Sequence, residues 1–230
     1  MYIDSILLAS RDDELDFMLA GGLSGIGGGR TPFGIFPELG IQRIDLNAVT
    51  VLAGSSVTPK LLLLRIIAAK LGSRILLNGM TAESLDEYLN LCVTKYSDFS
   101  CRNFGAVHIT LERSAEHLAQ GKSAAELFDK RMRPNSLILL EEPERGLTLE
   151  EQTELAYHIA CMSQSGSSQF VITSNSPVFL GIKGALIYDF DERPILPRRW
   201  HDSRLARSHV QFLEQLREDH THSKNIKTAD

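Results

Sequence analysis

Two adjacent glutamates at the end of an apolar run are the residues best placed to do chemistry in this 230-residue chain. The run Leu137–Leu140 leads directly into Glu141 and Glu142. A buried strand that ends in carboxylates presents them at the edge of its sheet, because an ionised glutamate inside the core would be costly. Such carboxylates can hold Mg²⁺ through a bound water or orient an attacking water.

The segments around these glutamates predict how they are positioned. A helix-like run over 149–162 follows them, and a second apolar run at 169–172 then leads into Thr-Ser-Asn-Ser-Pro at 173–177. Alternating strands and helices imply a mostly parallel sheet covered by helices. The sequence therefore predicts an α/β fold.

Three sequence blocks carry a resemblance to a known family. They are LILLEEPERGLTLEEQ at 137–152, QFVITSNSP at 169–177 and GALIYDFD at 184–191. In content, order and spacing they resemble the ABC-type ATPases, and within that group the chain is most similar to small soluble bacterial ATPases related to chromosome-maintenance and recombination ATPases. The segment TPFGIFPELGI at 31–41 resembles the same family more weakly. The resemblance implies a P-loop NTPase-like fold with a shortened helical insertion.

The resemblance also implies roles for the polar residues after the strands. Glu141 would hold Mg²⁺ through water, at a position where the family usually has aspartate. Glu142 matches the carboxylate that orients the attacking water in phosphoryl transfer. Asn175 replaces a histidine that contacts the γ-phosphate, and an amide can hydrogen-bond phosphate but carries no positive charge.

The segment from Gly54 to Leu61 matches the phosphate-loop template G-x-x-x-x-G-K-[ST] in part. In that template backbone N–H groups surround the phosphates and the lysine contacts the terminal ones. Lys60 fits, whereas Pro59 replaces a glycine and Leu61 replaces the hydroxyl residue that would ligate Mg²⁺. The expected ATP contacts are Gly54, Ser55, Ser56, Thr58, Lys60 and Leu61. Without the C-terminal blocks, an ordinary turn followed by a helix with proline in its first turn would be the better interpretation.

A signature segment of the family reaches the nucleotide of a second subunit. Its best match here is residues 119–123, in which Gly121 and Ser123 precede a helical run and could bind phosphate through backbone N–H groups. The resemblance thus implies a homodimer that encloses two nucleotides. An unknown protein partner is a further possibility.

The coarse pattern predicts one domain over residues 1–218, with a reduced helical subdomain at about 73–130 and a polar tail at 219–230. The expected strands are 2–8, 49–53, 106–109, 169–172 and 185–190, and the expected helices are 60–71, 82–92, 112–130, 149–162 and 204–218. The glycine-rich stretch 21–30 has no Lys-Ser or Lys-Thr and is expected to be a loop without chemistry.

Composition favours a cytoplasmic domain. Hydrophobic residues make up 43% of the chain, enough for a sizeable core, and no apolar run reaches membrane-spanning length. The first residues lack the basic start of a signal peptide. Three scattered cysteines, Cys92, Cys101 and Cys161, predict neither a disulfide framework nor a metal cluster. A net charge of −5 argues against broad electrostatic binding to nucleic acid.

Three functions remain open at this point. The first is an ABC-type ATPase domain that binds ATP and Mg²⁺ and hydrolyses ATP slowly while dimerising. The second is a pseudo-ATPase, a nucleotide-binding or protein-interaction module that lost turnover through Pro59, Leu61 and Asn175. The third is an α/β interaction protein that binds no nucleotide. Intact Glu142 favours the first function, and the altered phosphate loop favours the second.

Overall fold

The computed structural model describes residues 2–22, 31–55, 57–72, 80–97, 108–113, 132, 134–165 and 168–227. Its strands are β1 (Ile3–Leu7), β2 (Arg43–Asp45), β3 (Val49–Ala53), β4 (Val93–Tyr96), β5 (His108–Arg113), β6 (Ser136–Glu141), β7 (Gln169–Thr173), β8 (Leu186–Asp189) and β9 (Pro197–Arg198). Its helices are α1 (Arg11–Leu19), α2 (Ile35–Glu38), α3 (Val57–Lys70), α4 (Ala82–Leu91), α8 (Leu149–Gln164), α9 (Pro177–Leu180), α10 (Arg204–Lys227) and the 3₁₀ helix η2 (Trp200–Asp202).

The larger sheet of the described residues has the strand order β5-β6-β7-β3-β8-β9. The first five strands run parallel and β9 is antiparallel to β8. Every residue of β3 and of β7 is buried. Continuous apolar strands are expected when helices cover both faces of a parallel sheet. The predicted α/β class with a mostly parallel sheet is therefore confirmed.

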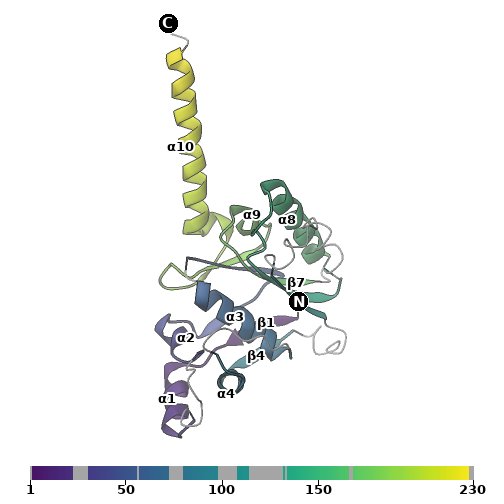
Figure 1. Cartoon of the computed structure of the whole chain (residues 1–230), viewed down its shortest axis with the longest axis vertical. Coiled ribbons are helices and arrows are strands. Elements are labelled where there is room, and N and C mark those ends of the chain that lie inside the picture. Colours follow the sequence, from purple (N-terminus) through teal and green to yellow (C-terminus); the bar gives the residue numbers. More distant parts are fainter. Residues whose placement is uncertain are drawn as a thin grey trace.

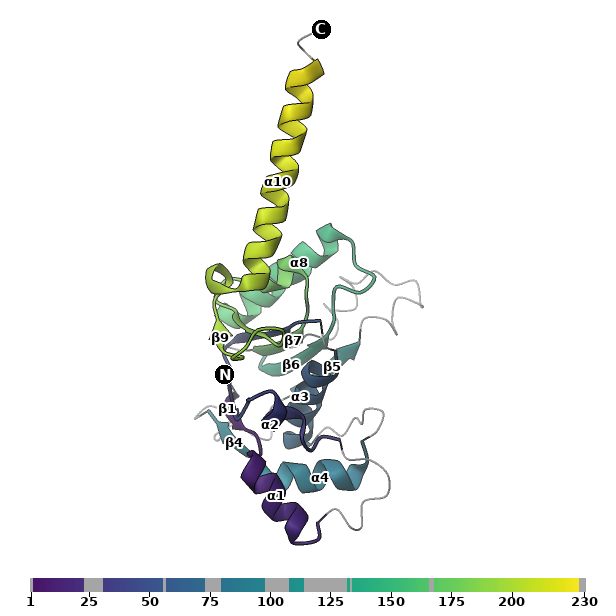
Figure 2. The ribbon, with the colours of Figure 1, turned by 90° about the vertical axis from the view of Figure 1, so that its left-hand side faces the viewer.

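Helices cover this sheet on both faces, as two views of the ribbon at right angles show (Figures 1 and 2). Successive residues of a strand point to opposite faces, so Leu52 of β3 joins the core on the α3 side while Val51 and Ala53 join the core under α8 and α9. Helix α3 follows β3 and α9 follows β7, so the connections from these neighbouring strands leave toward opposite faces.

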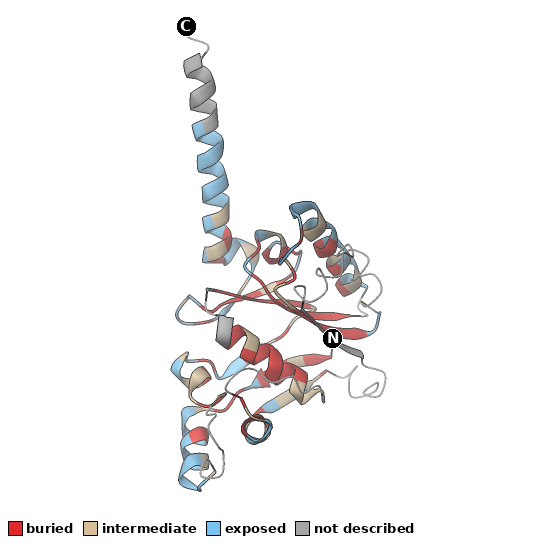
Figure 3. Cartoon of the chain, in the orientation of Figure 1, coloured by how far each residue is buried: buried red, intermediate tan, exposed pale blue. Residues whose placement is uncertain are grey.

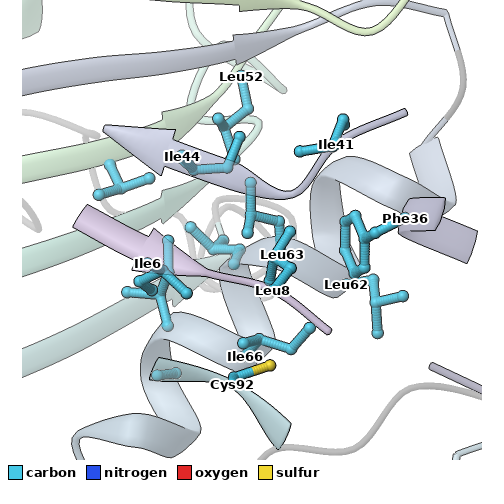
Figure 4. Close-up of a cluster of buried hydrophobic side chains, with 14 of the residues drawn as sticks. Ile6, Leu8, Phe36, Ile41, Ile44, Leu52, Leu62, Leu63, Ile66 and Cys92 are labelled. Atoms are coloured by element: carbon cyan, nitrogen blue, oxygen red, sulfur yellow. The ribbon is translucent and has the colours of Figure 1, made fainter. Parts of the chain in front are cut away.

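Helix α3 is buried between the two sheets. A smaller antiparallel sheet, with the described order β2-β1-β4, packs on its far side. Residues 62–68 of α3 are all buried (Figure 3). The close-up shows Leu63 and Ile66 of α3 among Ile6 of β1 and Ile44 of β2 (Figure 4). This placement explains an apolar helix without a polar face.

A buried glutamine joins the two sheets. The side chain of Gln169, the first residue of β7, accepts hydrogen bonds from the backbone N–H groups of Tyr2 and Ile3 at 2.8 and 3.0 Å. Its amide group donates to the carbonyls of Ile3 and Asn47 at 2.8 and 3.1 Å. Buried polar groups are stable only when bonded in this way. One side chain thus ties the parallel sheet to β1 and to the turn before β3.

Several expected elements differ from the structure at their ends. Helix α10 continues through Lys227, so the helix end predicted near Glu218 was wrong. Strand β5 includes residues 112–113, which the pattern assigned to a helix. Helix α1 was missed, although Ser10 and Asp13 form a capping box at its start. In the described part of the 73–130 span lie α4, β4 and β5. None of the helices among the described residues is long and apolar enough to cross a bilayer.

Candidate functional site at the strand ends

The residues predicted to do chemistry meet at the carboxyl edge of the parallel sheet. Gly54 follows β3, Glu141 ends β6, Asn175 lies two residues beyond β7 and Asp191 lies two residues beyond β8. Strands β3 and β7 are neighbours whose connections leave toward opposite faces. Open α/β sheets bind ligands at such switch points. The edge where β3 meets β7 is therefore the candidate site.

The turn after β3 is short, because β3 ends at Ala53 and α3 begins at Val57. Gly54 has φ of 123°, and a Cβ there would stand 3.1 Å from both Cβ and N of Phe190. Only glycine accepts this φ and this approach without strain. Helix α3 begins at Val57, so Pro59 lies in its first turn, where its missing N–H costs little. The backbone agrees with the ordinary-turn interpretation of this segment.

Two N–H groups that would contact a phosphate are bonded to side chains. The Gly54 N–H donates to Oδ1 of Asn175 at 2.8 Å. The Ser55 N–H donates to Oδ2 of Asp191 at 2.7 Å, and its hydroxyl donates to Oδ1 at 2.9 Å. Asp191 thus places a carboxylate where a phosphate-binding turn would hold an anion. These two hydrogen bonds lower the pKa of Asp191, together with the nearby cations Arg204 and Lys60, although burial alone would raise it.

Lys60 points back onto its own turn. Its side chain is 1% exposed, and Nζ donates to the Gly54 carbonyl at 2.5 Å. Burial lowers the pKa of Lys60, while the carboxylates of Glu142, Glu144, Asp191 and Asp189 act in the opposite direction. The lysine therefore balances the acidic groups of the edge and closes the turn.

Glu141 is held by a buried arginine from α3. Nη2 of Arg65 lies 2.5 Å from Oε2 of Glu141, with the arginine side chain fully buried and the glutamate side chain 15% exposed. Arg65 is a charged residue in an otherwise apolar stretch of α3, and buried charges are stable only when paired. The positive charge beside Glu141 is therefore supplied by the Arg65 side chain.

Glu142 has an unusual backbone. Its φ is 44°, a conformation that non-glycine residues rarely adopt. Its N–H donates to the Thr173 carbonyl at 2.9 Å and to the Thr173 hydroxyl at 3.1 Å, which fixes it against the end of β7. Its carboxylate pairs with Arg145 at 2.5 Å. Glu144 completes the edge, because its Oε1 accepts the Asn175 N–H at 3.1 Å.

These residues do not fit a magnesium ion. Arg65 already supplies the positive charge at Glu141, and Leu61 has no ligand atom where the template has a hydroxyl. Among the described residues, no group of three or more His, Cys, Asp or Glu side chains is arranged to hold a metal. A magnesium ion at Glu141 would stand close to this guanidinium, and two cations beside one carboxylate repel each other. The role predicted for Glu141 as a magnesium ligand therefore lacks geometric support.

The fit to ATP is also poor as the site stands. Five carboxylates surround the edge, from Glu141, Glu142, Glu144, Asp189 and Asp191, against the cations Lys60, Arg65, Arg145 and Arg204. A triphosphate brings further negative charge to this net acidic edge, and Asp191 would have to leave the Ser55 N–H first.

Other predicted site residues are outside the described residues or belong to the start of α3. Gly121, Ser123 and Ser56 are outside the described residues. The backbone of Thr58 and the residue Leu61 belong to the first turns of α3. Sequence reasoning missed Arg65 and Asp191 as parts of the site. A lone arginine inside an apolar helix was a signal for a buried ion pair, and Asp191 ends the GALIYDFD block.

Comparison with known proteins adds no assignment to this geometry. No protein-family model matches the chain, and a search of curated proteins gave no match.

Proposed function

We propose that this chain is a pseudo-ATPase, an α/β module that acts through protein contacts and does not turn over ATP. The observation that carries the proposal is the ion pair between Arg65 and Glu141. The family resemblance puts Mg²⁺ at the Glu141 carboxylate, and here a guanidinium is bound to that carboxylate. The occupied N–H groups of Gly54 and Ser55 support the same conclusion. The carboxyl-edge groups are used here to hold neighbouring loops together.

The groups at such a site have a structural role. Asn175 and Asp191 fasten the turn after β3 to the loops after β7 and β8, and Lys60 closes that turn from inside. The contacts of Asn175 and Asp191 join segments far apart in the sequence. Hydrogen bonds that involve a charged group, as at Asp191 and Lys60, are stronger than neutral ones. The edge is therefore a fixed surface on which a protein partner can bind.

A slow ATPase is the second candidate, and the position of Glu142 favours it. This carboxylate lies at the carboxyl edge, and of the acidic groups its charge acts most strongly on Lys60. A lysine and a carboxylate near one anion site are the minimum for positioning a phosphate and an attacking water. Turnover by this route requires Asp191 and Arg65 to give up their present partners.

The two candidates are separated by ATP binding and phosphate release from the purified chain. We expect no saturable binding by calorimetry up to millimolar ATP, with or without Mg²⁺, and no phosphate release above that of a Glu142→Gln variant. Saturable binding that Lys60→Ala abolishes, together with release that Glu142→Gln abolishes, would overturn the pseudo-ATPase proposal and establish the slow enzyme. Asp16→Asn, at an exposed position of α1 far from the edge in sequence, is the control for general effects of substitution.

A further inference from the structure

The only buried residue of helix α1 is a glutamate. Glu14 is 4% exposed, whereas the other residues of α1 are exposed or half-buried (Figure 3). A glutamate is almost never fully buried unless its charge is paired. The burial of Glu14 therefore has to be explained by what its carboxyl group contacts.

The carboxyl group of Glu14 is only half satisfied. Its Oε2 accepts the N–H of Gly34, the residue before α2, at 2.7 Å. Its Oε1 is buried and has no hydrogen-bond partner in the described part of the chain. Burial raises the pKa of Glu14, and the hydrogen bond from Gly34 lowers it. A buried oxygen without a partner destabilises the fold, and a donor from outside the chain would remove that cost.

A cavity of about 220 Å³ adjoins this glutamate. It lies between α1 and α2, which are neighbours in both ribbon views (Figures 1 and 2). An apolar cavity of about 150 Å³ is large enough for benzene, so this one has room for a slightly larger molecule. Its wall combines Glu14 with three apolar side chains and two further charged ones, which are Leu15, Met18, Pro37, Arg11 and Glu38. The terminal torsion of a glutamate is broad, so Oε1 can turn toward a ligand in this cavity.

The charges at the cavity indicate the sign of the ligand. Oε1 of Glu38 lies 4.0 Å from the position that a Cβ on Gly34 would take, so the carboxylates of Glu14 and Glu38 are both next to Gly34. The charge of Glu38 raises the pKa of Glu14, as expected for neighbouring carboxylates. Within the described ranges neither carboxylate forms an ion pair, with Arg11 or with any other cation. A cationic hydrogen-bond donor would relieve the repulsion and satisfy Oε1 together.

We propose that the cavity between α1 and α2 binds a small organic amine, with a primary ammonium group on an apolar body about the size of benzene. The ammonium donates hydrogen bonds to Glu14 and Glu38. The apolar body packs against Leu15, Met18 and Pro37. The site uses none of the groups at the carboxyl edge of the sheet, so it is independent of nucleotide and of the pseudo-ATPase proposal.

Two probe molecules of matched shape test the ligand class. Benzylamine carries the ammonium group, and benzyl alcohol carries a neutral hydroxyl in its place. We expect benzylamine to bind the full chain saturably at millimolar concentrations and to shift the NMR signal of the Met18 methyl group, which is assigned by its loss in Met18→Leu. Benzyl alcohol should bind about tenfold more weakly or less, because it makes no charge-assisted hydrogen bond. Equal affinities, or no saturable shift at Met18 with benzylamine at tens of millimolar, would overturn the proposal.

Charge-neutral variants locate the ammonium group. Glu14→Gln keeps an oxygen that can accept the Gly34 N–H and should weaken benzylamine binding by about tenfold or more. Glu38→Gln changes an exposed residue and should act in the same direction without any change in the core. Asp16→Asn removes the same charge from the opposite side of α1 and should leave the affinity unchanged. Circular dichroism and thermal unfolding check the fold of each variant. Wild-type affinity in both glutamate variants would contradict the assigned contacts.

The arginine at the cavity gives a test of sign. Arg11→Gln removes a charge of the same sign as the ligand, so benzylamine should bind this variant at least as tightly as the wild type. Phenylacetate, an anion with the same ring, should not shift the Met18 signal. If phenylacetate binds more tightly than benzylamine and Arg11→Gln abolishes its binding, the cavity is an anion site and the proposal fails.

Discussion

Arg65 of α3 and Glu141 of β6 form an ion pair with 2.5 Å between Nη2 and Oε2, beside the strand end that the sequence marked for magnesium. The arginine comes from the helix between the two sheets, and the glutamate is the last residue of strand β6. The pair therefore links the core of the molecule to its candidate site. Its loss should lower the free energy of unfolding of the whole chain.

The ion pair predicts a strong asymmetry between single and double substitution. Arg65→Met leaves Glu141 without its buried cation and should lower the free energy of unfolding by about 3 kcal/mol. Arg65→Met combined with Glu141→Leu removes both charges and should recover much of that loss. Urea unfolding of the two variants measures the difference. A double variant as unstable as the single one would mean that packing by Arg65, and not its charge, is what matters.

The close approach of Phe190 to Gly54 predicts that Gly54→Ala loses more stability than the positive φ alone would cause. Gly54→Ala forces a Cβ into contact with Phe190 and should destabilise the fold by about 2–4 kcal/mol. Gly40→Ala is the matched control, because Gly40 also has positive φ, 69°, but a Cβ there meets no heavy atom within 4 Å. Thermal unfolding of both variants separates backbone strain from contact. Equal losses would show that the approach of Phe190 relaxes easily.

The lowered pKa of Asp191 predicts that its contribution to stability is lost in acid. Its pKa in the folded chain is below the usual 3.8, because the hydrogen bonds from Ser55 and the nearby cations outweigh the effect of burial. The unfolded chain therefore binds more protons in this range, and the stabilisation is present above pH 3.8 and lost as the pH falls through the folded pKa.

Asp191→Asn should remove that pH dependence. We expect the variant and the wild type to differ most in stability near neutral pH and to converge below pH 3.8. Urea midpoints measured from pH 7 to pH 2.5 give the comparison, with Asp16→Asn as the control. Parallel curves for Asp191→Asn and wild type at all pH values would contradict the ion and hydrogen-bond contacts assigned to this carboxylate.

The lowered pKa of Lys60 predicts a gain of stability in alkali. Burial lowers its pKa in the folded chain below 10.5, so between the folded pKa and 10.5 the unfolded chain binds more protons. The wild type should therefore gain stability relative to Lys60→Met as the pH rises through this window. Thermal unfolding at intervals from pH 7 to pH 10.5 tests the trend. A difference that shrinks with rising pH would mean that the acidic neighbours outweigh burial.

The parallel sheet was predictable because its strands are simple patterns. Residues 49–53, 137–140 and 169–172 are apolar runs long enough for buried strands, and the helix between the last two is amphipathic. The small antiparallel sheet was harder, since β2 and β4 are short and partly exposed, with no run of apolar residues. Their position depends on α3 and on contacts far away in the chain.

The location of the candidate site was predictable from the sequence, but the contacts between its side chains were not. The strand pattern predicted that Gly54, Glu141 and Asn175 lie at one edge of the sheet. It did not predict the ion pair of Glu141 with Arg65. That pair joins residues 76 positions apart, and no local spacing rule connects them. The same holds for Ser55 and Asp191, which are 136 positions apart.

Gln169, which bridges the two sheets, affects how β1 separates from the parallel sheet during unfolding. The side chain of Gln169 bonds to Tyr2, Ile3 and Asn47, so β1 cannot peel away without leaving a buried amide unbonded. An unbonded buried amide costs on the order of 1–3 kcal/mol, which discourages local opening at this seam. The amide protons of Tyr2 and Ile3, although close to the start of the chain, should therefore exchange with solvent as slowly as those in the middle of β7, so that both sheets lose their protection in a single event.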